Sequence, residues 1–280
     1  MCHASIIQAV GQHVKTSRRN FLKTSSSAMA ASVPMALVAS DGVANTLAST
    51  LTKTSGRIID LTHTITPDFP SYYGRAHFAM RETRNQTIDG YTSFALDIPE
   101  HFGTHIDAPI HFADDVLAVD ALPPSHLIVP LVVINIAARA EGDADTRLTP
   151  DDIRHWQNRY GDIPQGACVA MHSGWAKKVH TPAFRGFDGT LRHFPGFHVE
   201  TAYMLLEETQ TTSLAVDTFS LDHGISPDFP THRVWLPVNR FGIENIANLD
   251  QVPEAGATLF IGAPKHQGGS GGQARIMAVV

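Results

Sequence analysis

The chain contains the stretch His101-Phe102-Gly103-Thr104-His105-Ile106-Asp107-Ala108-Pro109-Ile110-His111-Phe112. Three imidazoles and one carboxylate therefore lie within eleven positions. Neutral imidazole and carboxylate are the ligands that zinc and other borderline or hard divalent ions prefer, and ligands from one short segment save loop-closure entropy. The alternative is a segment whose histidines form only local hydrogen bonds. Four ligand-type side chains around a glycine and a proline favour the metal site.

The composition is that of a folded chain with a substantial core. Its 280 residues are 43% hydrophobic and 17% charged, and the length lies between one large domain and two. The formal net charge is −6, and no Lys- and Arg-rich run with aromatic residues occurs after the first quarter, so we expect no nucleic-acid partner. Cysteine occurs only at Cys2, in the leader described next, and at Cys168, so no disulfide is expected in the mature domain.

The first 50 residues have the form of a twin-arginine export signal and linker. Arg18-Arg19 precedes Phe21-Leu22, and a run of small and apolar residues covers 28–39. This run is about twelve residues, whereas a membrane span needs about twenty. A disordered basic tail and a membrane anchor are the alternatives. The pattern favours an exported protein, periplasmic or secreted, with no stable membrane span and with its catalytic domain over residues 55–280.

Periodicity from residue 57 onward predicts a mixture of strands and helices. Apolar runs predict strands over 57–66, 91–98, 127–137, 167–171, 213–216, 258–261 and 274–280. Length alone leaves a helix open for 127–137. The sequence Thr149-Pro150-Asp151-Asp152 supplies an N-cap, an early proline and early acids, which predicts a helix to about Tyr160, and a second helix is predicted over 199–208. This order predicts a single α/β domain with a mixed sheet.

The predicted strand over 91–98 leads directly into the His-rich stretch. Its apolar residues Phe94, Leu96 and Ile98 occupy alternate positions, a pattern typical of a strand. The His-rich stretch therefore follows a strand end, which is a usual place for a functional site.

Two other chemistries are not favoured. Gly268-x-Ser270-x-Gly272 matches the nucleophile-elbow pattern of serine hydrolases, but that motif needs a following helix and a later histidine, and the last histidine is His266. A flexible or ligand-closing glycine turn is the better interpretation. Cys168 lies inside an apolar strand with no basic neighbour in sequence, which indicates a buried structural thiol.

The C-terminal third offers two more ligand-type side chains. His232 and Glu244 stand among apolar residues, where a solvated charge is not expected. A buried pair that satisfies itself is the alternative. Beside the first cluster, metal ligation is the stronger interpretation for both residues.

These residues together resemble the cyclase-like metal hydrolases, a family that includes bacterial kynurenine formamidases and isatin hydrolases. The resemblance covers about residues 57–280 and is most specific at H-x-G-T-H-x-D-x-P-x-H, which the chain matches at every fixed position from His101 to His111. His232 and Glu244, followed by Asn245 and Leu249, are similar to the formamidase pattern. The resemblance implies a swivelling β/β/α-type fold.

The resemblance also implies a role for each residue. One metal ion would be bound by His101, His105 and Asp107, and a second by Asp107, His232 and Glu244, with Asp107 as the bridge. His111 would be the general acid and base. The implied cofactor is a divalent metal, zinc or manganese, with two ions per site, and the implied assembly is a homo-oligomer, either a dimer or a tetramer.

The two branches of the family differ at one ligand. In the isatin-hydrolase branch the glutamate that would match Glu244 is not retained and one manganese is bound, so the presence of Glu244 favours two metals. The tail, with its turn from Gly268 to Gly272 followed by Arg275, resembles the isatin-hydrolase branch more closely. The resemblance therefore leaves both substrate classes open.

The residues and the resemblance together predict a metal-dependent amidohydrolase of arylformamidase type. We expect it to cleave a C–N amide bond in an N-acyl arylamine or a cyclic amide through activated water, with His111 moving the proton. Tyr72, Tyr73 and Trp175 are candidates for an aromatic wall around this small-molecule substrate, and plain packing is the alternative. Three other functions stay open: isatin-hydrolase-like ring opening, an exported metal- or small-molecule-binding protein without turnover, and a lyase or cyclase.

Overall fold

The computed structural model describes residues 56–74 and 78–280. The predicted export signal and linker over residues 1–50 lie outside these ranges. The chain from Ser55 to Val280 forms one compact unit. Among the described residues, no helix combines the length and the apolar character that a membrane crossing requires.

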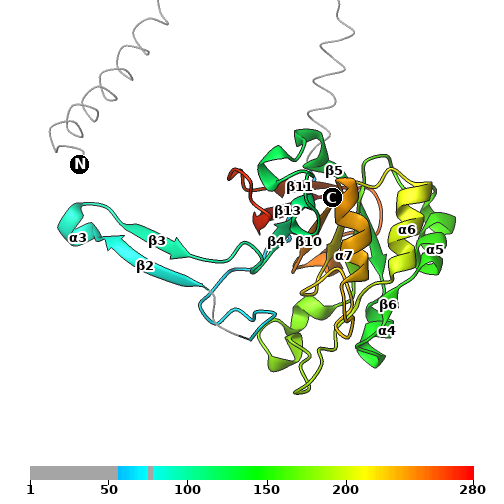
Figure 1. The fold of residues 1–280 in the computed structure, drawn as a ribbon, viewed down its shortest axis with the longest axis horizontal. Helices are drawn as coiled ribbons and strands as arrows, with labels where there is room; N and C mark the ends of the chain where they lie inside the picture. The colour runs from blue at the N-terminus through cyan, green and yellow to red at the C-terminus, as the bar shows by residue number, and fades with distance from the viewer. Residues whose placement is uncertain (1–55, 75–77) are drawn as a thin grey trace, which may run out of the picture. The chain divides into compact units, whose positions relative to one another are not determined.

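One mixed sheet of nine strands forms the body of this unit (Figure 1). In order across the sheet, the strands are β1 (Ile58–Asp60), β13 (Arg275–Val279), β11 (Ala257–Gly262), β5 (Ile128–Asn135), β7 (Cys168–His172), β9 (Ser213–Val216), β10 (Phe241–Glu244), β4 (His105–Asp107) and β12 (Gly271–Gln273). Neighbours among β5, β7, β9 and β10 pair in parallel, and the remaining pairs are antiparallel. The predicted α/β domain with a mixed sheet is confirmed.

Two hydrophobic cores bury both faces of the central strands. Along β7, Cys168 and Ala170 point into one core, and Val169 and Met171 point into the other. A strand covered on both faces is apolar along its whole length instead of alternating, as the sequence of β7 shows. The run over 127–137 is a strand as predicted, because β5 occupies most of it before the short helix α4 (Ala137–Gly142) begins.

Three helices contribute side chains to the second of these cores: α5 (Pro150–Tyr160), α6 (Val199–Glu208) and α7 (Pro230–Trp235). Helix α5 begins where the sequence predicts it. The structure shows a capping box there, in which the backbone N–H of Thr149 donates to Asp152 Oδ2 at 2.8 Å. Two short strands, β6 (Arg147–Leu148) and β8 (Gly196–Phe197), pair in parallel in a sheet of their own.

A two-stranded hairpin lies apart from the large sheet (Figure 1). Strand β2 (Ala79–Arg84) pairs antiparallel with β3 (Ser93–Asp97), and the short helix α3 (Gln86–Asp89) lies between them. We call residues 79–97 the arm. The strand predicted over 91–98 is confirmed by β3, although it belongs to this separate hairpin.

Candidate metal centre

The His-rich stretch contains a strand, because His105–Asp107 form β4 between β10 and β12. Side chains alternate along a strand, so His105 and Asp107 share one face. In the antiparallel strand β10, Glu244 lies directly opposite His105 and Gly242 lies opposite Asp107. A Cβ at position 242 would lie 3.3 Å from Asp107 Oδ2, so the glycine leaves room for this carboxylate. The register of two strands thus brings three predicted ligands together.

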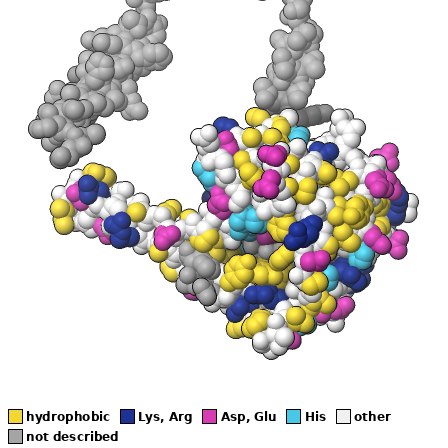
Figure 2. Space-filling view, in the orientation of Figure 1, with side chains coloured by type: hydrophobic (Ala, Val, Ile, Leu, Met, Phe, Trp, Pro, Cys, Tyr) yellow, Lys and Arg dark blue, Asp and Glu magenta, His cyan; other side chains and the backbone are white. Residues whose placement is uncertain are grey.

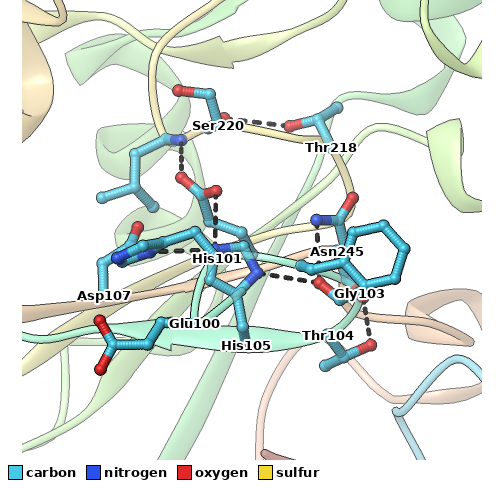
Figure 3. Close-up of polar contacts among 12 residues, drawn as sticks. Glu100, His101, Gly103, Thr104, His105, Asp107, Thr218, Ser220 and Asn245 are labelled. Carbon is cyan, nitrogen blue, oxygen red and sulfur yellow. Dashed lines mark hydrogen bonds and ion pairs between the residues drawn. The ribbon is translucent and has the colours of Figure 1, made fainter. Parts of the chain in front are cut away.

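His105 is oriented by a backbone carbonyl. Its Nδ1 lies 2.9 Å from the oxygen of Gly103, which also accepts a hydrogen bond from Asn245 Nδ2 at 3.0 Å (Figure 3). A carbonyl only accepts, so the proton of His105 lies on Nδ1, and Nε2 presents a lone pair. That Nε2 is buried without a hydrogen bond to any described residue, 3.3 Å from Asp107 Oδ1 and 3.4 Å from Glu244 Oε2.

His232 comes from helix α7 and is oriented by a carboxylate. Its Nδ1 lies 2.6 Å from Asp222 Oδ2, and the Asp222 carboxylate also accepts the backbone N–H of Thr231 at 2.7 Å. Asp222 therefore holds the proton of His232 on Nδ1 and turns Nε2 towards the centre. Nε2 lies 3.3 Å from Asp107 Oδ2 and 3.2 Å from Glu244 Oε1.

His101 has an outer partner as well. Its Nε2 lies 2.9 Å from Ser270 Oγ, and that hydroxyl lies 2.5 Å from Glu100 Oε2. Its Nδ1 lies 2.6 Å from Asp107 Oδ1. A Cβ at Gly271 in β12 would lie 2.7 Å from the His101 ring. The predicted glycine turn thus leads into a strand that packs closely against a predicted ligand.

The outer partners of the three histidines leave only hydrogen-bond acceptors facing the centre. The Ser270 hydroxyl, which donates to Glu100, the Gly103 carbonyl and the Asp222 carboxylate each accept one imidazole N–H. The three inner ring nitrogens then face the carboxylates of Asp107 and Glu244, and lone pairs facing buried carboxylates need a cation between them. Histidines that bind a metal give their other N–H to a carboxylate or carbonyl in the same way. All five predicted ligands converge, and the donor set fits a divalent metal ion.

The pKa values of His105 and His232 also indicate that the centre favours positive charge. Burial alone would lower the pKa of His105, but Asp107 and Glu244 outweigh it and raise the pKa to about 10. Burial is likewise outweighed at His232, whose pKa is raised well above its usual value by hydrogen bonds to Asp107, Asp222 and Glu244. In the metal-free protein, protons on the imidazoles would supply the positive charge, so a metal ion and protons compete for the site.

The two oxygens of Asp107 face different histidines. Oδ1 faces His101 and His105, whereas Oδ2 faces His232. Among the described residues, two groups of three side chains have ligand atoms close enough to share an ion. Within each group the ligand atoms lie within 4.8 Å of one another. The first group is His101, Asp107 and His111, and the second is His105, Asp107 and Glu244. Asp107 belongs to both groups, as a bridging carboxylate would.

His111 stacks on His101, with ring centroids 3.8 Å apart and an interplanar angle of 22°. The imidazole is exposed beside the pocket, yet the surrounding protein desolvates it and lowers its pKa to about 4, against the opposing effect of Asp107. A neutral imidazole at pH 7 can accept a proton from a nearby water. The position also lies within reach of an ion bound at His101, so a ligand role and a proton-transfer role are both compatible with it.

A cavity of about 370 Å³ opens onto the metal centre. This volume suits a small molecule, and the lining includes Tyr72 and Tyr73, both predicted wall residues. Trp175 does not line it. Its indole is only 2% exposed and donates to the carbonyl of Phe184 at 2.8 Å inside a third hydrophobic core. The predicted aromatic wall is therefore corrected to exclude Trp175, whose role is packing.

Ser270, His101 and Asp107 are connected in the order of a serine-hydrolase triad. Two observations argue against a serine nucleophile. Ser270 does not line the cavity, and its hydroxyl donates to Glu100, which leaves its oxygen as an acceptor for His101. Ser270 is better described as a residue that positions His101.

Three residues support the histidines of the centre in ways that were not predicted. Asp222 contacts His232, Ser270 contacts His101, and Glu100 contacts Ser270. Asp222 lies ten positions before His232, and no local pattern connects them, because their contact forms only when α7 packs beside the segment after β9. Glu100 directly precedes His101, and an acid beside a histidine cluster is a signal that the sequence did offer.

Comparisons with known proteins identify the family and similar folds. The family described as putative cyclase matches residues 59–223. The isatin hydrolase of Roseibium aggregatum is 30% identical over 244 residues, which cover 80% of this chain and 91% of that protein. The structure of isatin hydrolase A from Labrenzia aggregata bound to benzyl benzoate is similar with a TM-score of 0.77 and 33% identity, covering 85% of this chain and 98% of that one. An isatin hydrolase bound to the product analogue thioisatinate also gives a TM-score of 0.77, at 27% identity, covering 87% and 99% of the two chains.

Proposed function

This chain belongs to the cyclase family, and from that premise we propose that it is a metal-dependent hydrolase that opens the C–N bond of a cyclic aromatic amide of the isatin class. One observation carries the proposal. Ring nitrogens of three histidines, each oriented by an outer partner, face two carboxylates at the end of a cavity lined by Tyr72 and Tyr73. The relatives that support this substrate class are isatin hydrolases.

We propose that the centre holds zinc or manganese, as two ions that share Asp107. A metal ion held there would lower the pKa of a water molecule towards about 7 and would polarise the substrate carbonyl. The chain supplies the orientation, because Ser270, Gly103 and Asp222 fix the three histidine rings from outside.

His111 is proposed to move the proton. The unprotonated ring nitrogen of His111 takes a proton from the attacking water as the oxygen–carbon bond forms, and it gives that proton to the amide nitrogen as the C–N bond breaks. Its low pKa keeps the imidazole neutral before the reaction. Tyr72 and Tyr73 would pack against the aromatic ring of the substrate.

A second substrate class is favoured by Glu244. Its two oxygens face His105 and His232, which supports a second ion and with it the formamidase type, whose substrate is an N-acyl arylamine. A Glu244→Gln variant should lower the metal content from two ions to one per chain. Unchanged metal content in that variant would remove the observation that supports the formamidase type as a second candidate.

The experiment that tests the function combines metal analysis with a substrate panel. The purified protein, loaded with zinc or manganese, is offered isatin, formanilides and lactams, and we expect hydrolysis of isatin to be fastest. A His111→Gln variant should keep its metal and lose about 10²–10⁴-fold in turnover. Loss of metal in that variant would make His111 a ligand. Bound metal with no turnover on any amide would favour a binding protein instead.

We also propose that the protein is exported through the twin-arginine pathway, on the strength of Arg18-Arg19 and the apolar run that follows. A variant with both arginines changed to lysine should stay in the cytoplasm when cells are fractionated. Export that is unaffected by this change would refute the proposal.

A further inference from the structure

Tyr72 lines the cavity from a turn that lies outside the helices and strands. One backbone hydrogen bond closes this turn, in which the N–H of Gly74 donates to the carbonyl of Ser71 at 3.1 Å. The Tyr72 ring is half-buried. Connecting segments are more mobile than the elements that they join, so a wall residue on such a turn needs further contacts to keep one orientation.

Arg192 supplies two of these contacts. Figure 2 shows several Lys and Arg side chains beside hydrophobic side chains on the body, and cation–π pairs are one form of such contact. The guanidinium carbon of Arg192 lies 4.0 Å from the centroid of the Tyr72 ring, and Arg192 Nε donates to the Tyr72 carbonyl at 2.9 Å. One side chain thus contacts both the ring and the backbone of Tyr72. Arg192 does not line the cavity, so it makes these contacts from outside.

Neighbouring aromatic rings leave a place for this contact. The centroids of Phe194, Phe219 and Phe229 each lie 6.4 Å from the centroid of Tyr72, and that of Tyr73 lies 5.2 Å away. The guanidinium carbon of Arg192 is closer than any of these centroids. A cation over the ring therefore adds a directional contact to the packing of the aromatic side chains.

Arg192 is itself held by a short hairpin over residues 186–193. It forms an antiparallel bridge with Phe187, and Asp188 Oδ1 accepts the backbone N–H of Thr190 at 2.7 Å within the turn. A Cβ at Gly224 would lie 2.5 Å from the Arg192 carbonyl oxygen, so the glycine lets the two segments pack closely. The guanidinium is therefore presented to Tyr72 by a well-anchored backbone.

We propose that Arg192 is a positioning residue that holds Tyr72 in the cavity wall and thereby sets the affinity for an aromatic substrate. For the substrate, this inference rests on the proposed hydrolase function. An ordered wall spares the free energy that binding would otherwise spend on ordering the side chain. A substrate ring gains most, because it packs against the ring of Tyr72.

The first test is steady-state hydrolysis of isatin by the metal-loaded protein. Arg192→Gln should raise KM about tenfold and change kcat by less than about twofold, because the substrate and the transition state lose the same contact. Arg192→Lys keeps a positive charge and a donor, so KM should return to within about threefold of the wild type. Metal content should be unchanged in both variants.

A matched control is another arginine that lies over a tyrosine ring. The Arg159 guanidinium carbon is 5.0 Å from the ring centroid of Tyr160, and neither residue lines the cavity. Arg159→Gln removes a contact of the same kind and should change KM by less than about twofold.

The second test needs no turnover. The chain has five tyrosines, which are replaced with a fluorinated analogue, and the fluorine NMR resonance of Tyr72 is identified by its loss in Tyr72→Phe. In Arg192→Gln this resonance should narrow and move towards its position in the unfolded protein, whereas Arg159→Gln should leave it in place.

Four results would overturn the proposal: an unchanged Tyr72 resonance in Arg192→Gln, an unchanged KM, an equal rise of KM in Arg159→Gln, or loss of metal in Arg192→Gln, which would indicate a general structural role. If the wild type hydrolyses no amide, the proposed function fails, and the fluorine spectrum alone decides whether Arg192 orders Tyr72.

Discussion

The metal centre holds polar side chains away from water, whereas the arm holds apolar side chains in water. Asp107 is 1% exposed and Glu244 is 5% exposed, although both are carboxylates. Leu96 and Ile88, at 61% and 85%, are among the most exposed large hydrophobic residues of the described chain. Each region places a side chain where its transfer free energy is unfavourable.

The difference between the two regions lies in what would offset that free energy. Buried carboxylates and unprotonated imidazoles are stabilised by a cation, so the centre would be stabilised by a bound metal ion. Exposed apolar side chains are stabilised by contact with another apolar surface, so the arm would be stabilised by apolar contact instead of by an ion. The same reasoning about burial thus predicts ligands of opposite chemistry, and substitutions can test each region separately.

Asp107→Asn should produce the largest effect. The variant keeps the shape of the side chain but removes the charge that faces His101, His105 and His232. Breaking a buried charge interaction costs about 3–5 kcal/mol, so metal affinity should fall by about two to three orders of magnitude or more, and turnover with it. The metal content after dialysis and the hydrolysis rate are the measurements.

A matched control for this variant is Asp222→Asn. The Asp222 carboxylate contacts the His232 ring only at the nitrogen that faces away from the centre, and it also accepts the backbone N–H groups of Thr231 and His232. An outer partner is worth about 10–100-fold in metal affinity, so this loss should be smaller. Equal losses in the two variants would contradict the assignment of Asp107 as the bridging ligand.

Ser270→Ala should have a moderate effect and decides between two interpretations of the same hydrogen bonds. As a residue that positions His101, Ser270 should contribute about 10–100-fold to metal affinity. As a triad nucleophile, its removal would reduce turnover by about 10⁶-fold while the metal stayed bound. Metal titration and turnover measured on the same preparation separate these outcomes, and only the second would restore the serine-hydrolase interpretation.

The candidate ligands could be selected from the sequence because they lie in dense or unusual local patterns. His101, His105 and Asp107 share one short segment, and His232 and Glu244 stand among apolar residues. Their relative geometry could not be predicted, because it depends on the register between β4 and β10 and on the packing of α7. Asp222 was missed for the same reason.

The arm shows the complementary limit of sequence patterns. The alternation of Phe94, Leu96 and Ile98 predicted a strand, and β3 confirms it. Alternation indicates that one face of a strand should be buried, but it does not say by which surface. Trp175 illustrates the converse, since an aromatic residue after a strand was compatible with a pocket wall and with packing, and only tertiary structure decided for packing.

Leu96→Glu should have a small effect on catalysis, although it places a charge on the exposed apolar face of the arm. Tyr73 precedes the arm and Pro99 follows it, and both line the pocket. A charge on this face would disturb the packing of the arm and leave these walls less ordered, and ordering one side chain costs about 0.5–1.5 kcal/mol, so kcat/KM should fall by about two- to tenfold, mainly through KM. Metal content should be unchanged. Loss of metal in this variant would show that the two regions are not separable.

Cys168 illustrates a third condition, because its buried thiol is neutral and needs no charged partner. Burial in β7 raises the pKa of its thiol from 9.0 to about 12. This difference of three units makes the thiolate about a thousandfold scarcer than in the unfolded chain, so a thiol reagent at pH 8 should label the native protein far more slowly than the unfolded protein.

Below pH 9 both states hold the proton and the thiol does not change stability with pH. Between pH 9 and about 12 only the unfolded state ionises, so stability should fall as the pH rises. Rapid labelling of the native protein, with metal and oligomeric state intact, would show that burial does not protect this thiol.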